Sequence, residues 1–155
     1  MLRAVRGLFG RCTIGIFAAA VADYHAAEKS RQKIKRNRDG LTLRLEPNPD
    51  ILATMAREKG EKLVVGFAAE TENVAENARK KLKEKNADLI VANDVSAEGA
   101  GFGSETNIVT LFSRDGRDLP LPKMSKAEVS QRILDEILRL RGALHGKPLT
   151  QRAGD

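Results

Sequence analysis

The sequence is poor in the residues from which disulfides, zinc sites and aromatic cores are built. Its 155 residues include one cysteine, two histidines and no tryptophan, and aromatic residues make up 4% of the chain. A single cysteine excludes an internal disulfide and a cysteine-rich zinc site. Cys12 stands in an apolar stretch and is expected to be a small buried side chain, while His25 and His145 are too distant in sequence to suggest a metal site. The core is therefore expected to consist of valine, isoleucine, leucine and alanine.

Long hydrophobic runs are lacking as well. The apolar run Cys12–Val21 covers roughly ten residues, which is too short to span a bilayer. Residues 1–23 nevertheless look like a secretory signal, because basic residues precede the run and Ala20-Val-Ala22 has the small-x-small pattern of a cleavage site. The alternative is a short amphipathic helix followed by a buried strand at 13–21. Cleavage after Ala22 would destroy that strand, so the two interpretations predict different amino termini for the mature protein.

Positive charge, by contrast, is in surplus. The formal net charge is +6 and the isoelectric point is about 9.7, with 41% hydrophobic and 31% charged residues. These proportions are typical of one soluble globular domain. The basic surplus favours anionic partners, which include nucleic acids, acidic membrane surfaces and phosphorylated small molecules.

Much of the positive charge lies in the segment 29–38, which is mostly polar and is expected to form a loop. The segment lacks the interleaved aromatic residues on which nucleic-acid bases stack. One alternative is a basic nucleic-acid-binding module that contacts phosphates through this segment. The other is a mobile loop in which Lys33 closes over a bound phosphate.

Continuous apolar runs at 62–68 and 88–92, like the run at 13–21, are typical of strands that are buried on both faces of a parallel sheet. Asp115-Gly116 between two further apolar runs is a hairpin signal. Strands that alternate with helices predict an α/β fold, a Rossmann-like three-layer sandwich with a mostly parallel sheet and a C-terminal hairpin and helix. The remaining expected elements are a strand at 41–45, helices at 48–59, 70–86 and 125–144, a flexible glycine-rich loop at 99–103, and hairpin strands at 107–113 and 118–121.

Two of the expected helices begin with capping signals. Asn48 is a suitable N-cap, Pro49 suits the first helical position, and Asp50 favours the positive end of the helix dipole. Ser125 and Glu128 form a capping box at the start of the last helix. The expected apolar stripe of that helix consists of Val129, Ile133, Ile137, Leu140 and Leu144.

Polar and aromatic residues stand where the expected strands end. Asp23 follows the first buried strand, Phe67 lies near the end of the second, and Asn93-Asp94 follow the third. Asn48 to Asp50 begin a helix after another strand. Each has an ordinary structural explanation as a turn former, cap or core residue. Because ligands of such sheets bind at the carboxyl ends of the strands, the shared placement of these residues indicates a site.

The expected helix at 70–86 carries lysines in an informative pattern. Lys81 and Lys85 lie seven and eleven residues after Val74, so they project towards the buried side or its margin, whereas Lys80 and Lys83 project to solvent. Two like charges four residues apart are mildly unfavourable unless an anion lies between them, and a polyphosphate would supply one. The apolar stripe of this helix is expected to be Val74, Ala75, Ala78 and Leu82.

Five stretches occur in order along the chain: Ala19-Ala-Val-Ala-Asp-Tyr24, Lys33-Ile-Lys-Arg36, Asn48-Pro-Asp-Ile51, Gly66-Phe-Ala-Ala-Glu-Thr71 and Asp88-Leu-Ile-Val-Ala-Asn-Asp-Val95. Together they resemble bacterial phosphopantothenoylcysteine synthetase, and the resemblance runs from about Ile14 to Leu144. That domain is often the C-terminal half of a bifunctional flavoprotein of coenzyme A biosynthesis, fused to phosphopantothenoylcysteine decarboxylase.

The resemblance implies a CTP-dependent ligase. In that family CTP and 4′-phosphopantothenate form an acyl-cytidylate with release of pyrophosphate, and the amine of L-cysteine then attacks the activated carbonyl with release of CMP. Mg²⁺ accompanies the CTP, and FMN belongs only to a fused or partner decarboxylase domain. A cytoplasmic homodimer that binds neither membrane nor nucleic acid is expected on the same grounds.

The resemblance also assigns roles to residues of this chain. Lys33 matches the first lysine of the family's Lys-x-Lys-Lys motif and would be catalytic in the turnover of the acyl-cytidylate, while Arg36 replaces the last lysine of the motif. Asp23 matches a CTP-binding acid, and Phe67 matches a residue that lies against the nucleotide. The implied CTP-binding residues are Ala19, Ala20, Asp23, Lys33, Asn48, Pro49, Asp50, Ile51, Phe67, Lys81 and Lys85.

One part of the family pattern has no counterpart in the sequence. The family domain normally begins with a strand, a glycine-rich phosphate loop and a segment that supplies an asparagine to the acyl-cytidylate. The resemblance therefore implies a synthetase domain at 1–145 that is incomplete at its amino terminus, followed by a disordered tail at 146–155.

Overall fold

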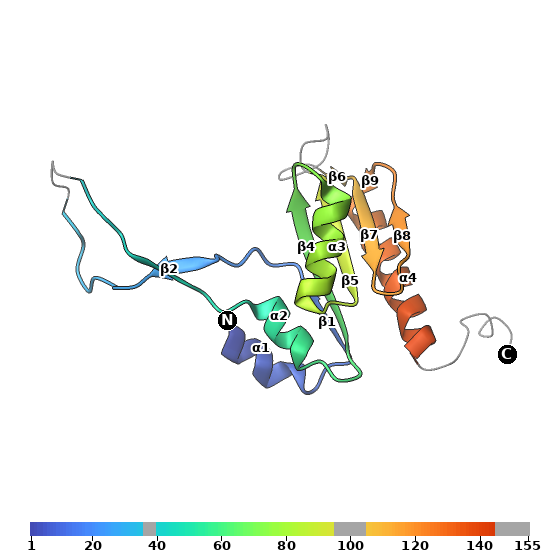
Figure 1. Cartoon of the computed structure of the whole chain (residues 1–155), viewed down its shortest axis with the longest axis horizontal. Helices are drawn as coiled ribbons and strands as arrows, with labels where there is room; N and C mark the ends of the chain where they lie inside the picture. Colours follow the sequence, from blue (N-terminus) through green and yellow to red (C-terminus); the bar gives the residue numbers. More distant parts are fainter. Residues whose placement is uncertain (36–39, 95–104, 145–155) are drawn as a thin grey trace, which may run out of the picture.

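The computed structural model describes residues 1–35, 40–94 and 105–144. The expected glycine-rich loop at 99–103, Arg36 and the expected tail at 146–155 lie outside these ranges. Figure 1 shows the order of the elements along the chain. These are α1 (Leu2–Phe9), β1 (Ile14–Phe17), β2 (Tyr24–Ala26), β3 (Leu45–Pro47), α2 (Ile51–Arg57), β4 (Leu63–Glu70), α3 (Val74–Lys85), β5 (Leu89–Asp94), β6 (Thr106–Asn107), β7 (Val109–Ser113), β8 (Asp118–Pro120), β9 (Met124–Ser125) and α4 (Lys126–Leu144).

The main sheet has the strand order β1-β4-β5-β7-β8. Strands β1, β4 and β5 are parallel to one another, and the β7–β8 hairpin extends the sheet with strands antiparallel to β5 and to each other. Gly116 in the hairpin turn has a φ of 89°, a conformation that glycine adopts without strain. The expected α/β sandwich with a C-terminal hairpin and helix is confirmed.

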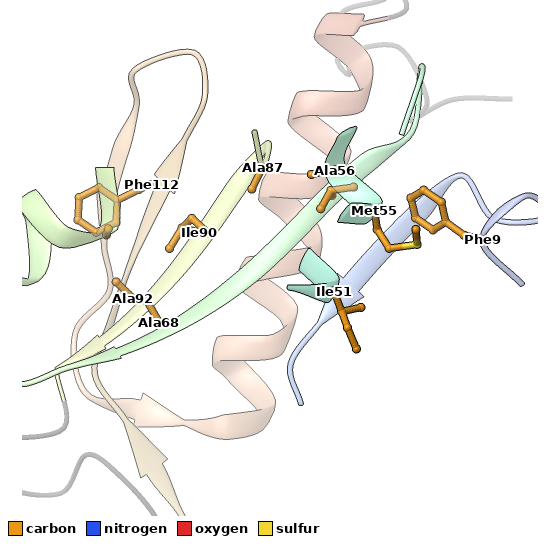
Figure 2. Packing of buried hydrophobic residues seen from close by; sticks show 11 residues of the cluster. Phe9, Ile51, Met55, Ala56, Ala68, Ala87, Ile90, Ala92 and Phe112 are labelled. Carbon is orange, nitrogen blue, oxygen red and sulfur yellow. The ribbon is translucent and has the colours of Figure 1, made fainter. Parts of the chain in front are cut away.

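The alternation of side chains along the central strands separates two cores. Val64, Ala68, Ile90 and Phe112 face α1, α2 and α3, and Figure 2 shows Phe9, Met55 and Ala56 from this side. Residues one position along the same strands, such as Leu63, Val65, Leu89 and Val91, pack instead against α4. As expected, these cores consist mainly of aliphatic side chains. Two layers of helices thus enclose the sheet.

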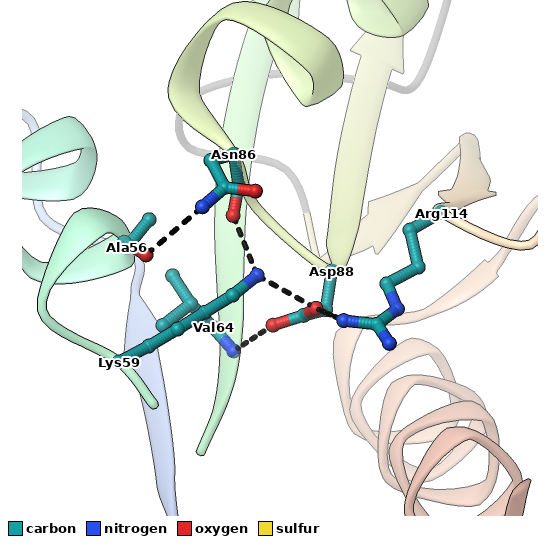
Figure 3. Close-up of polar contacts among 6 residues, drawn as sticks. All are labelled: Ala56, Lys59, Val64, Asn86, Asp88 and Arg114. Atoms are coloured by element: carbon teal, nitrogen blue, oxygen red, sulfur yellow. Dashed lines mark hydrogen bonds and ion pairs between the residues drawn. The ribbon is translucent and has the colours of Figure 1, made fainter. Parts of the chain in front are cut away.

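A buried ionic cluster lies at the amino ends of the central strands β4 and β5. Asp88 is completely buried, and its carboxylate accepts hydrogen bonds from Lys59 Nζ at 2.8 Å, the Val64 amide at 2.8 Å and Arg114 Nη1 at 2.6 Å. Figure 3 shows that Lys59 also reaches the carbonyl oxygen of Asn86. The charge of Asp88 is thereby matched by two cations and one backbone donor, which is the condition under which a buried carboxylate is tolerated.

The first strand differs from its prediction. Strand β1 is confined to Ile14–Phe17, and residues 18–23 leave the sheet and are exposed, so the expected strand at 13–21 buried on both faces is wrong. Among the described strands β1 pairs only with β4 and stands at the edge of the sheet. Helix α4 does not cover it fully, and Ile16 remains 47% exposed. Cys12, expected to be buried, is exposed beside this edge.

The segment that follows forms a ribbon instead of the expected strand at 41–45. Strand β2 pairs antiparallel with β3, and the ribbon formed by residues 24–35 and 40–47 extends away from the main sheet (Figure 1). The hydrogen bond from the Ala27 amide to the Arg44 carbonyl oxygen, 2.9 Å long, continues the pairing beyond the strands. Pairing with a distant segment therefore placed β3 at 45–47 rather than where the local alternation predicted it.

Helix boundaries differ from the predictions where tertiary contacts intervene. Asp50, not Asn48, caps α2, since Asp50 Oδ1 accepts a hydrogen bond from the Ala53 amide at 2.8 Å. Helix α3 begins at Val74 instead of 70, because β4 continues to Glu70. Ala75 and Leu144 are exposed rather than part of the buried stripes. The capping box of α4 is confirmed, as the side chains of Ser125 and Glu128 hydrogen-bond each other's backbone amides.

Within the described residues no helix has the length and apolar character needed to cross a membrane.

Candidate functional site

A cavity of about 660 Å³ lies where β1 ends and the chain leaves the sheet. Residues 18–23 after β1, the turn before α2, Phe67 of β4 and two lysines of α3 contribute to its walls. Ten of the eleven residues expected to bind the nucleotide line it: Ala19, Ala20, Asp23, Asn48, Pro49, Asp50, Ile51, Phe67, Lys81 and Lys85. The tertiary structure thus gathers residues that are spread over more than sixty positions of the chain.

Asn48 ties the two irregular walls of the cavity together. Its side-chain amide donates a hydrogen bond to the Ala22 carbonyl oxygen at 2.8 Å, and its backbone amide donates to the Asp23 carbonyl oxygen at 2.7 Å. Both contacts cross 25 or more positions of sequence. Asn48 therefore holds the loop that carries Asp23 against the turn before α2, and this role explains why it does not cap the helix.

Gly66 leaves room on β4 for a side chain of α2. A Cβ atom at this position would approach Leu52 Cδ2 to 2.6 Å, which is closer than real Cβ atoms come to their neighbours. The absence of a side chain at Gly66 lets Leu52 lie directly over β4. Helix α2 consequently brings Asp50 and Ile51 to the cavity.

Lys81 and Lys85 are half-buried at the margin of the buried face of α3, as the helical periodicity predicted. Lys80 and Lys83 are exposed. Each of the half-buried lysines is paired with a carboxylate of the chain: Lys85 Nζ lies 2.6 Å from Asp50 Oδ2, and Lys81 Nζ lies 3.5 Å from Glu70 Oε1. The expected need for an anion beside these lysines is met, at least in part, by these carboxylates.

The surroundings of Asp50 favour the charged form of its carboxyl group. Partial burial alone would raise the pKa of the Asp50 carboxyl, but the hydrogen bonds from Lys85 and from the Ala53 amide outweigh it. The pKa of Asp50 is therefore held below its usual value. The cavity accordingly contains two cationic lysines, one firmly ionised acid and Asp23.

Apolar side chains also line the cavity. Phe67 is 38% exposed and Ile16 is 47% exposed, although both lie on strands of the main sheet. A partly exposed ring at the end of a sheet strand offers a flat surface for a planar group. Cations on one side and an aromatic ring on another suit a ligand that has both an anionic and a planar part.

Lys33 is the one expected site residue that does not line the cavity. It lies on the exposed ribbon between β2 and β3. A catalytic role for Lys33 requires that the ribbon bring it to a cavity, and its role stays a prediction.

The carboxyl end of β5 carries a further polar group. The Oδ1 atom of Asn93 is buried and has no hydrogen-bond partner within the described residues. Asn93 pairs with Ala69 of β4, two positions beyond Phe67, so it lies at the same end of the sheet as the cavity. Buried oxygens without partners are rare in folded proteins, and this one is available to a ligand or water.

The described residues offer no preformed metal centre, because no three His, Cys, Asp or Glu side chains gather among them. Asp23 and Asp50 stand singly in the cavity wall. This arrangement fits Mg²⁺, which proteins commonly bind through one or two carboxylates together with the phosphates of a substrate.

Sequence reasoning missed two contributions to the site. Val5 and Leu8 of α1 and Met1 directly before it line the cavity, although no motif pointed to this helix. Its amphipathic pattern was the available signal. Glu70 contacts Lys81, although the carboxylate was expected to belong to a helix.

Comparison with known proteins gives consistent results. The family model of the DNA/pantothenate metabolism flavoprotein C-terminal domain matches residues 1–140. The chain is 49% identical over 140 residues to the coenzyme A biosynthesis bifunctional protein CoaBC of Bacillus subtilis (strain 168), covering 90% of this chain and 34% of that protein. For the protein of the same name from Escherichia coli (strain K12), the identity is 47% over 142 residues, covering 89% of this chain and 35% of that protein.

A solved structure is similar as well. The crystal structure of the C-terminal domain of a coenzyme A biosynthesis bifunctional protein CoaBC superposes with a TM-score of 0.71 at 39% identity, covering 90% of this chain and 60% of that chain. The chain thus spans about a third of the curated relatives that it matches.

Proposed function

Because the chain belongs to the DNA/pantothenate metabolism flavoprotein C-terminal domain family, we propose that it acts in the CTP-dependent joining of 4′-phosphopantothenate to L-cysteine in coenzyme A biosynthesis. The observation that carries this proposal is the cavity that unites Lys81 and Lys85 with the ring of Phe67. The names of the relatives place them in the same biosynthetic route.

The proposed reaction has two steps. A carboxylate oxygen of 4′-phosphopantothenate attacks the α-phosphorus of CTP, a new P–O bond forms, and pyrophosphate leaves. The amine of cysteine then attacks the carbonyl carbon of the acyl-cytidylate, loses a proton, and expels CMP. Negative charge accumulates on phosphate oxygens in both steps, so cations close to the nucleotide lower both barriers.

Each wall of the cavity has a part in this scheme. Lys81 and Lys85 neutralise the triphosphate through charge-assisted hydrogen bonds. The Asn48–Ile51 turn contacts the cytosine, and Phe67 lies against the nucleotide. Asp23 orients the ribose or a metal-bound water, and Ala19 and Ala20 leave room for the ligand beside the end of β1. Lys33, carried by the ribbon, offsets charge as cysteine attacks and CMP leaves.

Mg²⁺ is the proposed cation, bound mainly by the phosphates of CTP with Asp23 as the available carboxylate. It would screen the charge of the triphosphate. FMN has no proposed role in this chain, and belongs to a fused or partner decarboxylase domain. We propose that the chain is cytoplasmic, as expected for an enzyme of the coenzyme A biosynthesis route named for its relatives.

The binding step tests the proposal directly. Isothermal titration with CTP, ATP and a short DNA duplex at one salt concentration should show Mg²⁺-dependent binding of CTP. Duplex binding that falls steeply with salt, without any preference for CTP, would replace the proposal with a nucleic-acid-binding function. The titration distinguishes the two functions because CTP would bind in the cavity, whereas a DNA duplex would bind to the basic ribbon.

Lys33 separates the two chemical steps. We expect pyrophosphate release when 4′-phosphopantothenate is added to the chain with CTP. The Lys33→Ala variant should retain this release but lose at least about tenfold in cysteine-dependent CMP release, because one charge near the leaving group is removed. Equal CMP release by the variant would contradict the catalytic role of Lys33. CTP binding without pyrophosphate release would restrict the proposed function of this chain to nucleotide binding.

The ribbon supports the proposal that the chain forms a homodimer. Its apolar side chains are more than half exposed, and an isolated two-stranded ribbon is at best marginally stable in water. A second copy that packs on the ribbon would remove this apolar surface from water. The exposed apolar residues of the ribbon are Tyr24, Ile34, Leu41, Leu43 and Leu45.

A double substitution on the ribbon tests the dimer. Leu43→Asp with Leu45→Asp should convert a dimer to a monomer in size-exclusion chromatography with light scattering, because two charges would enter the interface. Leu134→Asp is the control, since Leu134 on α4 is 45% exposed but lies away from the ribbon. A dimer that survives the double substitution would exclude the ribbon as its interface.

A further inference from the structure

Glu70 is a partly buried carboxylate at the site to which the proposed mechanism assigns no role. It is the last residue of β4, and it lies on the same face of the strand as Val64 and Ala68, which pack towards α3. Its Oε1 atom lies 3.5 Å from Lys81 Nζ, and its side chain is 20% exposed. Lys81 lines the cavity, whereas Glu70 is not among the lining residues.

Glu70 is itself held in place. Asn77 Nδ2 donates hydrogen bonds to Glu70 Oε2 at 3.1 Å and to the Glu72 carbonyl oxygen at 3.0 Å. Asn77 and Lys81 lie four residues apart on α3, so both side chains reach the carboxylate from adjacent turns. One oxygen of Glu70 thus faces a fixed amide and the other faces the lysine. The Glu70–Lys81 pair thus forms from residues of the chain alone and needs no ligand.

The second lysine of the cavity is held differently. Lys85 lies 2.6 Å from Asp50 Oδ2, and Asp50 both lines the cavity and caps α2. A phosphate that approaches Lys85 therefore meets a carboxylate on its own side. At Lys81 the paired carboxylate belongs to Glu70, which does not line the cavity, and an ammonium group has three donors. A phosphate in the cavity can accept a hydrogen bond from Lys81 while Glu70 keeps its own.

We infer that Glu70, fixed by Asn77, is a positioning residue that aims Lys81 at the phosphates of a bound nucleotide. The inference rests on the proposed function of the cavity. A lysine side chain has four rotatable bonds, and restricting it before the ligand arrives reduces the entropy that binding must remove. Lys81 is accordingly the principal phosphate contact, and Lys85 the weaker one.

The sign of one mutational effect distinguishes positioning from simple charge. Glu70 is an anion near an anionic ligand, so if it acted only through its charge, its removal would strengthen CTP binding. If it positions Lys81, its removal releases the lysine and weakens CTP binding. The two accounts therefore predict opposite changes of one dissociation constant.

The experiment is a double-mutant cycle on Mg²⁺-dependent CTP binding, measured by isothermal titration. Glu70→Ala should weaken binding about tenfold relative to the wild-type chain, the scale of one charge-assisted hydrogen bond. In the Lys81→Ala background the same substitution should cause no further loss, because the residue through which Glu70 acts is gone. Glu70→Gln, which retains an oxygen for Lys81, should recover part of the affinity.

Glu76→Ala is the matched control. Glu76 is an exposed acid on the first turn of α3, so the variant makes the same change of charge on a neighbouring turn. Its affinity for CTP should stay within about twofold of the wild-type value. Thermal melting of each variant verifies that the domain is folded at the temperature of the titration.

Four results would overturn the inference. Tighter CTP binding by Glu70→Ala would show that Glu70 acts only through its charge. Unchanged binding would show that Glu70 has no effect on the nucleotide. An equal loss in the Lys81→Ala background would show that Glu70 acts by another route. A wild-type chain that binds no CTP would remove the proposed function and this inference together, whereas the first three results leave the proposed function intact.

Discussion

Replacing Lys81 and Lys85 together with alanine is expected to weaken Mg²⁺-dependent CTP binding by about a hundredfold. Both lysines line the cavity, and each charge-assisted hydrogen bond to a phosphate contributes about 1.5–3 kcal/mol. Two such contacts correspond to at least two factors of ten in the dissociation constant. Isothermal titration of the double variant with CTP at fixed magnesium and salt concentrations measures the loss.

The chain offers a closely matched control for this experiment. Lys80 and Lys83 lie on the same helix and are exposed, so replacing both with alanine removes the same charge without touching the cavity. That variant should bind CTP within about twofold of the wild-type chain, since exposed charges at a distance are largely screened. Equal losses in the two double variants would show that general charge, not the cavity, attracts the nucleotide. Undiminished binding by Lys81→Ala, Lys85→Ala would exclude the assignment of these lysines to the phosphates.

Asp88→Asn is expected to lower the free energy of unfolding by about 3–5 kcal/mol. Asp88 is completely buried, and its loss of charge would leave Lys59, whose side chain is 10% exposed, without its carboxylate. An uncompensated buried charge is the costly consequence of breaking such a pair. Arg114, which is 45% exposed, can turn to solvent instead. Urea denaturation followed by circular dichroism measures the change.

Glu58→Gln provides the comparison for an exposed pair. Arg6 and Glu58 form an ion pair of 2.6 Å with half-exposed side chains, so its removal should lower the free energy of unfolding far less than Asp88→Asn does. A similar small cost for Asp88→Asn would show that the buried cluster does not stabilise the domain in the way its geometry indicates. Because the cluster lies at the opposite ends of the strands from the cavity, folded Asp88→Asn protein should retain its affinity for CTP.

Features that depend on near neighbours in the sequence were predictable. The continuous apolar runs of β4 and β5 indicated strands covered on both faces, and the Ser125–Glu128 capping box marked the start of α4. The 3.6-residue period of α3 is enough to separate Lys81 and Lys85 from Lys80 and Lys83. In each case the sequence pattern that allowed the prediction spans only one or two helical turns or a few residues of a strand.

Features that depend on which distant segments meet were not predictable in the same way. The apolar composition of β1 indicated a buried strand, but its position at the sheet edge leaves Ile16 exposed. Asn48 has the chemistry of a helix cap, yet its bonds to Ala22 and Asp23 take it to the loop and leave the cap to Asp50. Local propensity correctly indicated which interactions these side chains can make, but it did not indicate which distant residues they contact.

The sequence by itself determined the α/β class and most of the apolar faces of α3 and α4, because period and capping act over a few residues. The resemblance of its motifs to the synthetase family supplied the expected nucleotide-binding residues. Only the tertiary structure decided that ten of these residues share one cavity, that Lys33 stands apart on the ribbon, and that Glu70 and Asp50 pair with the two lysines. Those outcomes depend on how far β4 extends, where β1 ends and how closely Leu52 approaches Gly66. Such distances are set by packing between segments remote in sequence.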